Sequence, residues 1–244
     1  MRIIATIEAR ATSTRLPGKV LMDIAGKPML QHVIERTRRI PILDEVVVAT
    51  TVNRTDDAIE ALALSLGVSC FRGSEDDVLQ RLADAVTSHR ADVLVKVTGD
   101  MPLIDPELVA AQIQFFTAGQ YDYVSEVGMK NTAAWDEAQT FPLGFGAEIV
   151  NPAALVHAAD TSTDPKDREH ACRFIIDRPA QFRLGGFHAQ GKYAGARRPD
   201  LRLAVNTDED LATVRRIFDA LLPRDPAFGI LDVVTLLERS PELA

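Results

Sequence analysis

Short apolar runs alternate with amphipathic segments through the first half of the chain. Four runs are rich in β-branched residues and predict buried strands, at residues 3–7, 46–51, 68–71 and 92–98. The intervening segments have helical spacing and predict helices over residues 28–39, 56–66, 75–89 and 106–117. Pro28 suits a first helical position, Gly67 a helix stop, and the acids from Glu75 onward a first helical turn. This alternation predicts an α/β fold, with a mainly parallel sheet covered by helices on both faces.

The second half has a less regular pattern. Strands are expected at residues 121–125, 146–150, 182–188 and 201–205. Helices are expected at residues 152–160, 167–177, 208–221 and 230–239. A polar stretch over residues 127–139 fits either a mobile loop or a dimer arm. Since no segment resembles a linker, we predict one domain over 1–244, with a small acceptor or dimerisation insertion at about 127–190.

The predicted sheet indicates where a ligand would bind. In open α/β sheets, ligands lie beyond the carboxyl ends of the strands. The segments that follow Ile7, Thr51, Phe71 and Thr98 are therefore the expected walls of a site. Each of these segments is polar or contains glycine or proline.

Charge and composition exclude several classes of protein. The longest apolar runs are far too short to cross a bilayer, so no membrane partner is expected. Glu8 and Arg10 interrupt the first apolar run too soon for a signal peptide. The net charge is −8 and the basic residues are scattered, which argues against a nucleic-acid partner. Cys70 and Cys172 show no metal-ligand spacing, and two free thiols fit a cytoplasmic protein.

The loop after the first strand is rich in cations and hydroxyls. It runs from Glu8 to Lys19 and contains Arg10, Arg15, three hydroxyl residues and Gly18. Such a composition suits a triphosphate cradle, because small residues let backbone N–H groups approach while cations offset phosphate charge. The glycine spacings of a Walker or GxGxxG loop are absent. From the residues alone, a solvated polar loop remains an equal alternative.

Asp100 follows the fourth predicted strand and Gly99. A carboxylate at the end of a buried strand suits a hard cation such as Mg²⁺. An aspartate shortly before Pro102 is also typical of a turn or a helix cap, which leaves a purely local role open.

The order of several short motifs resembles the CMP-sugar-acid synthetases, which are the acylneuraminate and Kdo cytidylyltransferases. The opening segments Ala9-Arg10, residues 13–19 and residues 26–28 carry this resemblance. Residues 72–79, 98–105, 168–170 and 205–211 extend it and are most similar to the spore-coat polysaccharide branch. The resemblance spans nearly the whole chain. It implies a Rossmann-like nucleotidyltransferase fold of the glycosyltransferase-A type.

The resemblance also implies a reaction and its residues. CMP would be transferred from CTP to an acidic acceptor, with Mg²⁺ as cofactor and a homodimer as the assembly. Arg15, Lys19 and Asp100 would be catalytic. The nucleotide-binding residues would be Ala9, Arg10, Ser13, Thr14, Arg15, Lys19, Arg72, Thr98 and Gly99. The acceptor-binding residues would be Phe141, Gly144, Glu148, Arg168, Glu169 and His170.

The expected metal ligands are Asp100, Asn206 and Asp208. Asn206 departs from the family pattern, which has aspartate at this position. An asparagine oxygen brings no negative charge, so weaker magnesium binding is expected. Asp208 either substitutes as a ligand or is the N-cap of the following helix.

Other functions remain open on the sequence. A nucleotidyltransferase that uses another nucleoside triphosphate is one alternative, and a non-catalytic nucleotide-binding protein is another. A glycosyltransferase would require a DxD-type carboxylate pair, and Thr98-Gly99-Asp100 does not supply one.

Overall fold

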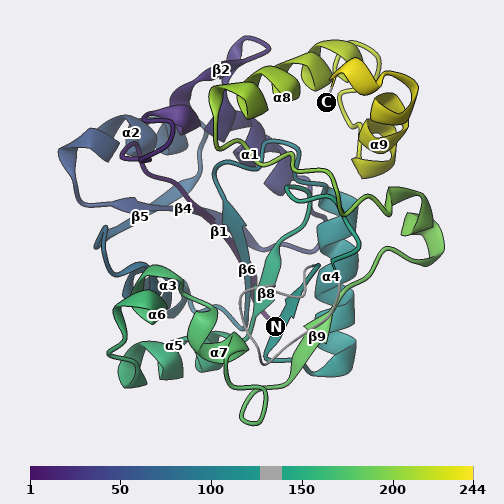
Figure 1. Cartoon of the computed structure of the whole chain (residues 1–244). Coiled ribbons are helices and arrows are strands. Elements are labelled where there is room, and N and C mark those ends of the chain that lie inside the picture. The colour runs from purple at the N-terminus through teal and green to yellow at the C-terminus, as the bar shows by residue number, and fades with distance from the viewer. Residues whose placement is uncertain (127–138, 244) are drawn as a thin grey trace.

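A computed structural model describes residues 1–126 and 139–243, and it contains a seven-stranded sheet (Figure 1). The strand order is β5-β4-β1-β6-β8-β7-β9. Four strands are parallel: β1 (Ile3–Glu8), β4 (Glu45–Thr51), β5 (Ser69–Gly73) and β6 (Val93–Thr98). The short strands β7 (Tyr123–Ser125), β8 (Glu148–Val150) and β9 (Leu184–Gly186) complete the sheet, and β8 is antiparallel to both neighbours. The predicted α/β fold with a mainly parallel sheet is confirmed.

The central strand β1 carries the core of the sheet. Ile7 is in register with Val48 of β4 and Val97 of β6, and all three side chains are fully buried. A parallel strand between two others is covered on both faces, so it needs a continuous apolar run. Alternate β1 residues therefore serve two cores: Ile3, Ala5 and Ile7 face one, and Ile4 faces the other.

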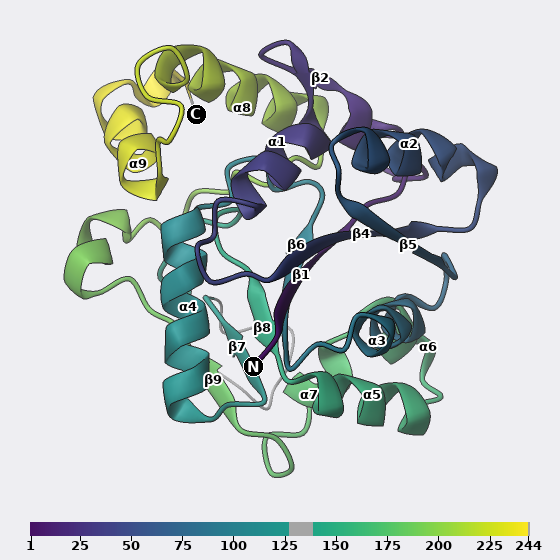
Figure 2. The same cartoon turned by 180° about the vertical axis from the view of Figure 1, so that it is seen from behind.

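Helices cover both faces of the sheet (Figures 1 and 2). One layer, which packs on the Ile7 face, contains α1 (Met29–Thr37), α2 (Asp57–Ser65), α4 (Pro106–Gly119), α8 (Asp208–Leu221) and α9 (Ile230–Arg239). The opposite layer contains α3 (Val78–Ser88), α5 (Pro152–Thr161), α6 (Pro165–Glu169) and α7 (Arg173–Ile176). Four short 3-10 helices and a two-stranded ribbon complete the described elements: η1 (Lys19–Leu21), η2 (Arg54–Asp56), η3 (Gly191–Ala196), η4 (Pro241–Leu243), β2 (Asp23–Ile24) and β3 (Lys27–Pro28).

Four predicted elements were wrong in detail. The third helix begins at Val78 rather than residue 75, because Asp77 is its N-cap and accepts a bond from the Gln80 N–H. The predicted helix over 167–177 is two short helices that break at His170. Residues 201–205 form one isolated parallel bridge to Leu143 instead of a strand. Pro28 ends strand β3 and is the N-cap of α1, not its first residue.

The predicted insertion at 127–190 lies partly outside the described residues, which omit 127–138. Its described strands β8 and β9 belong to the main sheet. Within residues 1–126 and 139–243, none of the helices combines the length and the apolarity that a membrane span requires.

Glu126, which follows β7, is a buried carboxyl group. Its side chain accepts a hydrogen bond from the Gly146 N–H at 3.3 Å, and burial raises its pKa from 4.5 to about 8. The folded chain therefore retains a proton that the unfolded chain loses near pH 4.5. Below pH 4.5 the group is protonated in both states, and the folded chain has its full stability. As pH rises from 4.5 to about 8, only the unfolded chain loses this proton, so the free energy of unfolding falls.

We expect Glu126→Gln to remove this dependence, since glutamine imitates the protonated carboxyl group. The variant and the natural protein should unfold alike near pH 4.5. By about pH 8 the variant should be more stable, by at most about 5 kcal/mol at about 1.4 kcal/mol per pKa unit. Urea unfolding across this pH range measures the difference. A stability difference that does not change with pH would contradict the expectation.

Candidate active site

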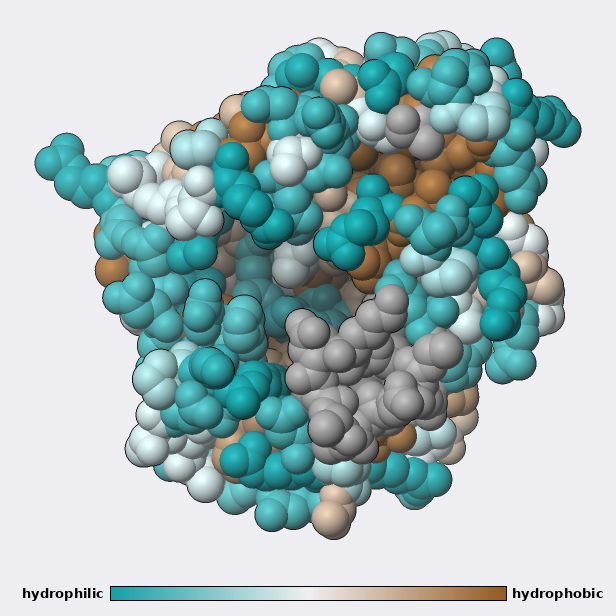
Figure 3. All heavy atoms as spheres, in the orientation of Figure 1, coloured by the Kyte–Doolittle hydropathy of each residue, from teal (hydrophilic) through white to brown (hydrophobic). Residues whose placement is uncertain are grey.

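A cavity of about 670 Å³ opens at the carboxyl ends of β1 and β6. Figure 3 shows that this face is hollowed near its centre, with hydrophilic residues along much of the border. The sequence-predicted residues that line it are Ala9, Arg10, Ser13, Thr14, Arg15, Lys19, Thr98, Gly99, Asp100, Glu169 and His170. Most of the predicted nucleotide loop and two of the predicted acceptor residues therefore share one cavity.

The loop between β1 and η1 is folded back on itself and tied to β4. Gly18 has a φ of 72°, a left-handed conformation that favours glycine, and its N–H donates to the Ala11 carbonyl at 2.8 Å. The Ala11 N–H in turn donates to buried Asp56, at 2.8 Å. The same carboxylate accepts from the Thr51 hydroxyl at 2.6 Å, so the end of β4 supports the loop.

The Lys19 ammonium group lies among three oxygen atoms. Asp100 Oδ2 and the Val205 carbonyl oxygen are each 2.7 Å from Nζ, and Asn206 Oδ1 is 3.4 Å away. The Lys19 side chain is only 10% exposed. Lys19 is thus anchored in the wall of the cavity and begins η1, whereas the sequence placed it on an open loop.

Asp100 is held from both sides at the end of β6. Its Oδ1 accepts a hydrogen bond from the Thr98 hydroxyl at 2.6 Å, while Oδ2 faces Lys19. Gly99 lies so close to β1 that an added Cβ would be 3.0 Å from the Glu8 carbonyl oxygen. Glycine at residue 99 therefore allows β6 to approach the neighbouring strand closely at this point, which brings Asp100 beside the loop.

Asn206 joins the two halves of the chain at this point. Its Oδ1 accepts from Arg15 Nη2 at 2.7 Å, and the Val205 N–H donates to the Asp100 carbonyl at 2.8 Å. Asp208 is exposed and is the first residue of α8. The alternative that Asp208 caps α8 is wrong, because Thr207 is the N-cap and forms a capping box with Asp210.

The oxygen atoms around the Lys19 ammonium fit a cation, because one carboxylate, one amide oxygen and one carbonyl are hard ligands. Among the described residues, no three His, Cys, Asp or Glu side chains gather as metal ligands. Magnesium is commonly held by one or two carboxylates together with substrate phosphates, which is the set that Asp100 and a bound nucleotide would provide. Neither Asp208 nor Asn206 lines the cavity, but Asn206 contacts the lining through its bonds to Arg15 and Lys19.

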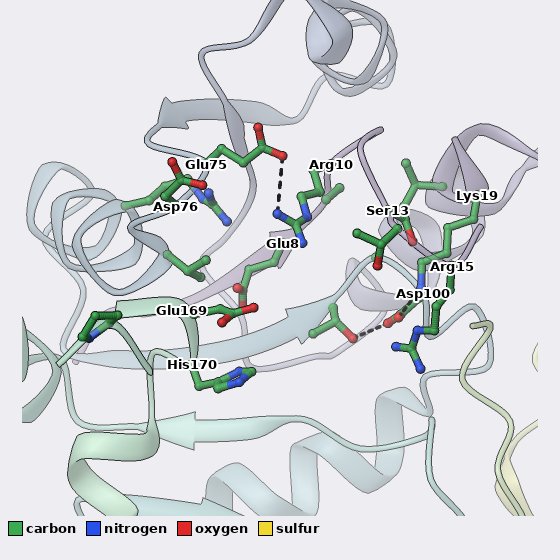
Figure 4. A pocket seen from close by; sticks show the side chains of 18 residues that line it. Glu8, Arg10, Ser13, Arg15, Lys19, Glu75, Asp76, Asp100, Glu169 and His170 are labelled. Atoms are coloured by element: carbon green, nitrogen blue, oxygen red, sulfur yellow. Dashed lines mark hydrogen bonds and ion pairs between the residues drawn. The ribbon is translucent and has the colours of Figure 1, made fainter. Parts of the chain in front are cut away.

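Arg10 lies on the side of the cavity where Glu75 is found, away from Lys19 and Asp100 (Figure 4). It lies 3.4 Å from Glu75 Oε1, and Thr12 and Asn53 also donate hydrogen bonds to the Glu75 carboxylate. Since α3 begins only at Val78, Glu75 and Asp76 precede it and line the cavity instead of occupying its first turn.

A buried charge network lies beneath the cavity floor. Lys96 of β6 contacts Glu148 of β8 and is 3.1 Å from Glu8 Oε1, and the Tyr123 hydroxyl donates to Glu148 at 2.5 Å. Burial alone would lower the pKa of Lys96, but the two carboxylates outweigh it and hold this pKa well above its ordinary value. Glu148, predicted to bind the acceptor, instead pairs with Lys96 and does not line the cavity.

Four other predicted residues lie outside the cavity because the fold uses them elsewhere. Arg72 donates to the carbonyls of Thr51 and Asn53, both at 2.8 Å, and so holds the turn after β4. Arg168 donates to the Ala159 carbonyl at 2.7 Å and lies 3.4 Å from Asp77, which joins α6 to α5 and α3.

The other two belong to the turn that follows residue 140. Phe141 is fully buried and stacks on Phe187, with ring centroids 6.1 Å apart. Gly144 lies against the backbone of residues 203–204. This turn therefore packs against neighbouring segments of the protein, and its residues do not reach the cavity.

Sequence reasoning missed several charged residues of the cavity and its floor. Glu8 and Arg81 line the cavity, and Lys96 supports Glu8 from below. Each had a signal in the sequence. Glu8 ends an apolar strand, Lys96 interrupts one, and Arg81 lies on α3 between the buried Leu79 and Leu82. A charge among buried apolar residues is costly without a partner, so these positions indicated a buried polar site.

Comparisons with known proteins agree with this geometry. A family model described as "Cytidylyltransferase" matches residues 4–225. The spore coat polysaccharide biosynthesis protein SpsF of Bacillus subtilis is 31% identical, over 99% of this chain and 96% of that protein. A 3-deoxy-manno-octulosonate cytidylyltransferase of Trichlorobacter lovleyi is 41% identical over 48% of this chain and 45% of its own length. The solved structure of a cytidylyltransferase from Leptospira borgpetersenii superposes with a TM-score of 0.89, at 27% identity, over 100% of this chain and 96% of that one.

Proposed function

The chain belongs to the cytidylyltransferase family, and we propose that it transfers the CMP part of CTP to a sugar acid with release of pyrophosphate. It is a CTP-dependent nucleotidyltransferase with the Rossmann-like fold of that family. The observation that carries the proposal is the convergence of Arg15, Lys19 and Asp100 in one cavity. Two cations and one carboxylate at the ends of adjacent strands provide what phosphate binding and transfer require.

The residues act on the phosphates mainly by position and charge. In the proposed reaction an acceptor oxygen attacks the α-phosphorus in line, and pyrophosphate leaves. Lys19 and Arg15 stabilise the negative charge that develops on the leaving pyrophosphate. Their side chains are already oriented by Asp100, Val205 and Asn206, so little reorganisation is needed when the nucleotide binds.

We propose Mg²⁺ as the cofactor, held by Asp100 with Asn206 beside it. When bound, the ion would neutralise phosphate charge and lower the pKa of the attacking hydroxyl group. Asp100 supplies the negatively charged oxygen, and Thr98 fixes its orientation through the 2.6 Å hydrogen bond. Asn206 adds an oxygen without charge, so phosphate oxygens of the substrate would supply further ligands.

The acceptor is proposed to enter beside Glu169 and His170, which lie at the end of α6 and line the cavity away from the phosphate loop (Figure 4). Support for a sugar acid comes from a relative whose printed name specifies 3-deoxy-manno-octulosonate as its substrate. The spore-coat relative, which covers nearly the whole chain, supports a role in polysaccharide biosynthesis.

Pyrophosphate release tests the proposal. The purified chain is incubated with CTP, magnesium and a panel of acidic sugars, with UTP in place of CTP as the control. Release that needs both CTP and an acidic sugar is expected. Binding of CTP without pyrophosphate release with any acceptor would indicate a non-catalytic nucleotide-binding protein, and equal turnover with UTP would indicate a different nucleotide specificity.

Asn206→Asp is expected to tighten magnesium binding, because it adds a negative charge next to Asp100. Two adjacent carboxylates attract a divalent cation more strongly, and we expect about tenfold tighter binding in the presence of CTP. Titration of magnesium in the turnover assay measures this affinity, as does calorimetry with a non-hydrolysable analogue of CTP. An unchanged affinity would show that residue 206 is not a ligand.

The assembly and the compartment are also proposals. We propose a homodimer, which the family resemblance supports, and sedimentation of the purified chain tests it. We propose a cytoplasmic location, which the two free cysteines support. Cys172 is buried and Cys70 is half-buried, so neither depends on a disulfide for its place in the fold.

A further inference from the structure

Two charged side chains of the cavity lining, Glu8 and Arg81, keep hydrogen-bonding capacity that the fold does not use. Among the described residues, the buried side-chain atoms without a hydrogen-bond partner are Thr6 Oγ1, Glu8 Oε1, Thr37 Oγ1, Arg81 Nε, Glu126 Oε2 and Tyr193 Oη. Of these residues, only Glu8 and Arg81 belong to the cavity lining, and Glu8 Oε1 has an ion-pair partner in the Lys96 ammonium group at 3.1 Å. Leaving Arg81 Nε unsatisfied is costly, and the Glu8 side chain is 14% exposed in the cavity, so both side chains point to bonds that form with the ligand.

Both side chains are held in place before any ligand binds. Glu8 ends β1, and the Lys96 ammonium group lies 3.1 Å from its Oε1, which holds the side chain in place. Arg81 is only 4% exposed, and its Nη1 donates to the Ser74 carbonyl. The site therefore presents one fixed acceptor and one fixed donor.

These two side chains match the chemistry that distinguishes one pyrimidine from another. Cytosine carries an exocyclic amine, a donor, next to its ring acceptors N3 and O2, whereas uracil has a carbonyl oxygen in place of the amine. A carboxylate is a suitable acceptor for the cytosine amine, and it repels the corresponding carbonyl of uracil.

We propose that Glu8 and Arg81 read the base of the nucleotide, with Glu8 accepting from the exocyclic amine and Arg81 donating to a ring acceptor. The pair selects CTP over UTP. This inference rests on the proposed function, and it adds the residues that determine nucleotide specificity.

The position and charge of Glu8 favour the base over the acceptor as its partner. Arg15, Lys19 and Asp100 occupy one end of the cavity, and Glu8 points into its middle, between this phosphate end and the end lined by Glu75 and Asp76 (Figure 4). An acidic acceptor beside the Glu8 carboxylate would meet repulsion, whereas the amine of cytosine is neutral and donates. Ala9 and Val78 add apolar surface to the lining, which suits the faces of a flat ring.

Nucleotide binding to Glu8→Gln tests the inference. Calorimetry in the absence of acceptor measures the dissociation constants of CTP and UTP for the variant and for the natural chain. Glutamine can rotate to donate to uracil as well as to accept from cytosine, and it loses the charge. We expect the preference for CTP to fall by about 10- to 100-fold.

Glu75→Gln is the matched control. Glu75 lines the same cavity, but its two oxygens already accept from Thr12 and Asn53. This variant is expected to change binding of both nucleotides alike and to retain the natural preference. The inference would be overturned if Glu8→Gln kept the preference of the natural chain for CTP over UTP. It would also be overturned if the substitution changed only the KM of the acceptor.

A modified nucleotide tests the same bond without changing the protein, which matters because Glu8 also contacts buried Lys96. The triphosphate of pyrimidin-2-one riboside lacks the 4-amino group and should bind the natural chain at least about tenfold more weakly than CTP. Equal binding of the two would overturn the inference. Failure of the natural chain to bind CTP at all would instead reject the proposed function.

Discussion

Replacing Lys19 by methionine is expected to lower kcat by about 100- to 1,000-fold, because a preorganised donor to developing charge is lost. The ammonium group is oriented by Asp100 and by the Val205 carbonyl, each at 2.7 Å, so it stabilises phosphate charge without rearrangement. Methionine retains the length of the side chain and most of its apolar contacts. Steady-state pyrophosphate release with saturating CTP measures the effect.

The fold should survive this substitution with a small loss of stability. The Val205 carbonyl loses a buried partner, which costs about 1–3 kcal/mol and lowers Tm by several degrees. Lys27→Met is the matched control, since the Lys27 side chain is 44% exposed and pairs with Glu35 at the surface. Lys27→Met should retain natural turnover. Unchanged turnover in Lys19→Met would remove Lys19 from the site.

Asp100→Asn is expected to reduce turnover by about 1,000-fold and to weaken the dependence on magnesium. Asparagine keeps an oxygen for the Thr98 hydroxyl but removes the charge that a divalent cation requires. A metal ion that polarises a phosphoryl oxygen contributes several kcal/mol, and each 1.4 kcal/mol corresponds to about tenfold in rate. Turnover measured across a magnesium titration separates weaker metal binding from a lower maximal rate.

Asp208→Asn makes the same chemical change at the other predicted carboxylate. Asp208 is exposed in the first turn of α8 and lies outside the cavity. At this position its negative charge interacts favourably with the helix dipole. This control should retain natural turnover and lose a few tenths of a kcal/mol of stability. If both variants respond alike to magnesium, Asp100 has no special role as a ligand.

The charge on the cavity lining limits which acceptors the site accommodates. Arg15 and Lys19 lie at the phosphate end, whereas Glu8, Glu75, Asp76 and Glu169 outnumber Arg10 and Arg81 around the rest of the cavity. An acidic acceptor must therefore direct its carboxylate toward the cationic end or toward His170. Substrates without a carboxylate are expected to lose that orientation and to react poorly.

Local sequence patterns determined the order of elements and the parallel sheet. A buried parallel strand must be apolar on both faces, and an amphipathic helix must repeat every 3.6 residues, so both signals lie within short windows. The same locality explains the accuracy for α9, whose bounds at residues 230 and 239 match the prediction. The loop from residue 8 to residue 19 and Asp100 were likewise recognisable, because their chemistry is contained in contiguous motifs.

Side-chain partners were decided only by the tertiary structure. Glu148 and Arg168 have suitable chemistry for binding an acceptor. In the fold, however, Glu148 pairs with Lys96, and Arg168 donates to the Ala159 carbonyl. Arg15 and Asn206 meet although 191 residues separate them along the chain. Such contacts depend on how distant segments pack, and no local window contains that information.

The sequence by itself determined the fold class, the family and the phosphate end of the site, because each is carried by a local pattern or a contiguous motif. The tertiary structure alone decided that Glu8 and Arg81 line the cavity, and that Arg81 Nε has no hydrogen-bond partner among the described residues. Whether a charged side chain is satisfied within the fold or remains free for a ligand depends on the neighbours that packing brings to it.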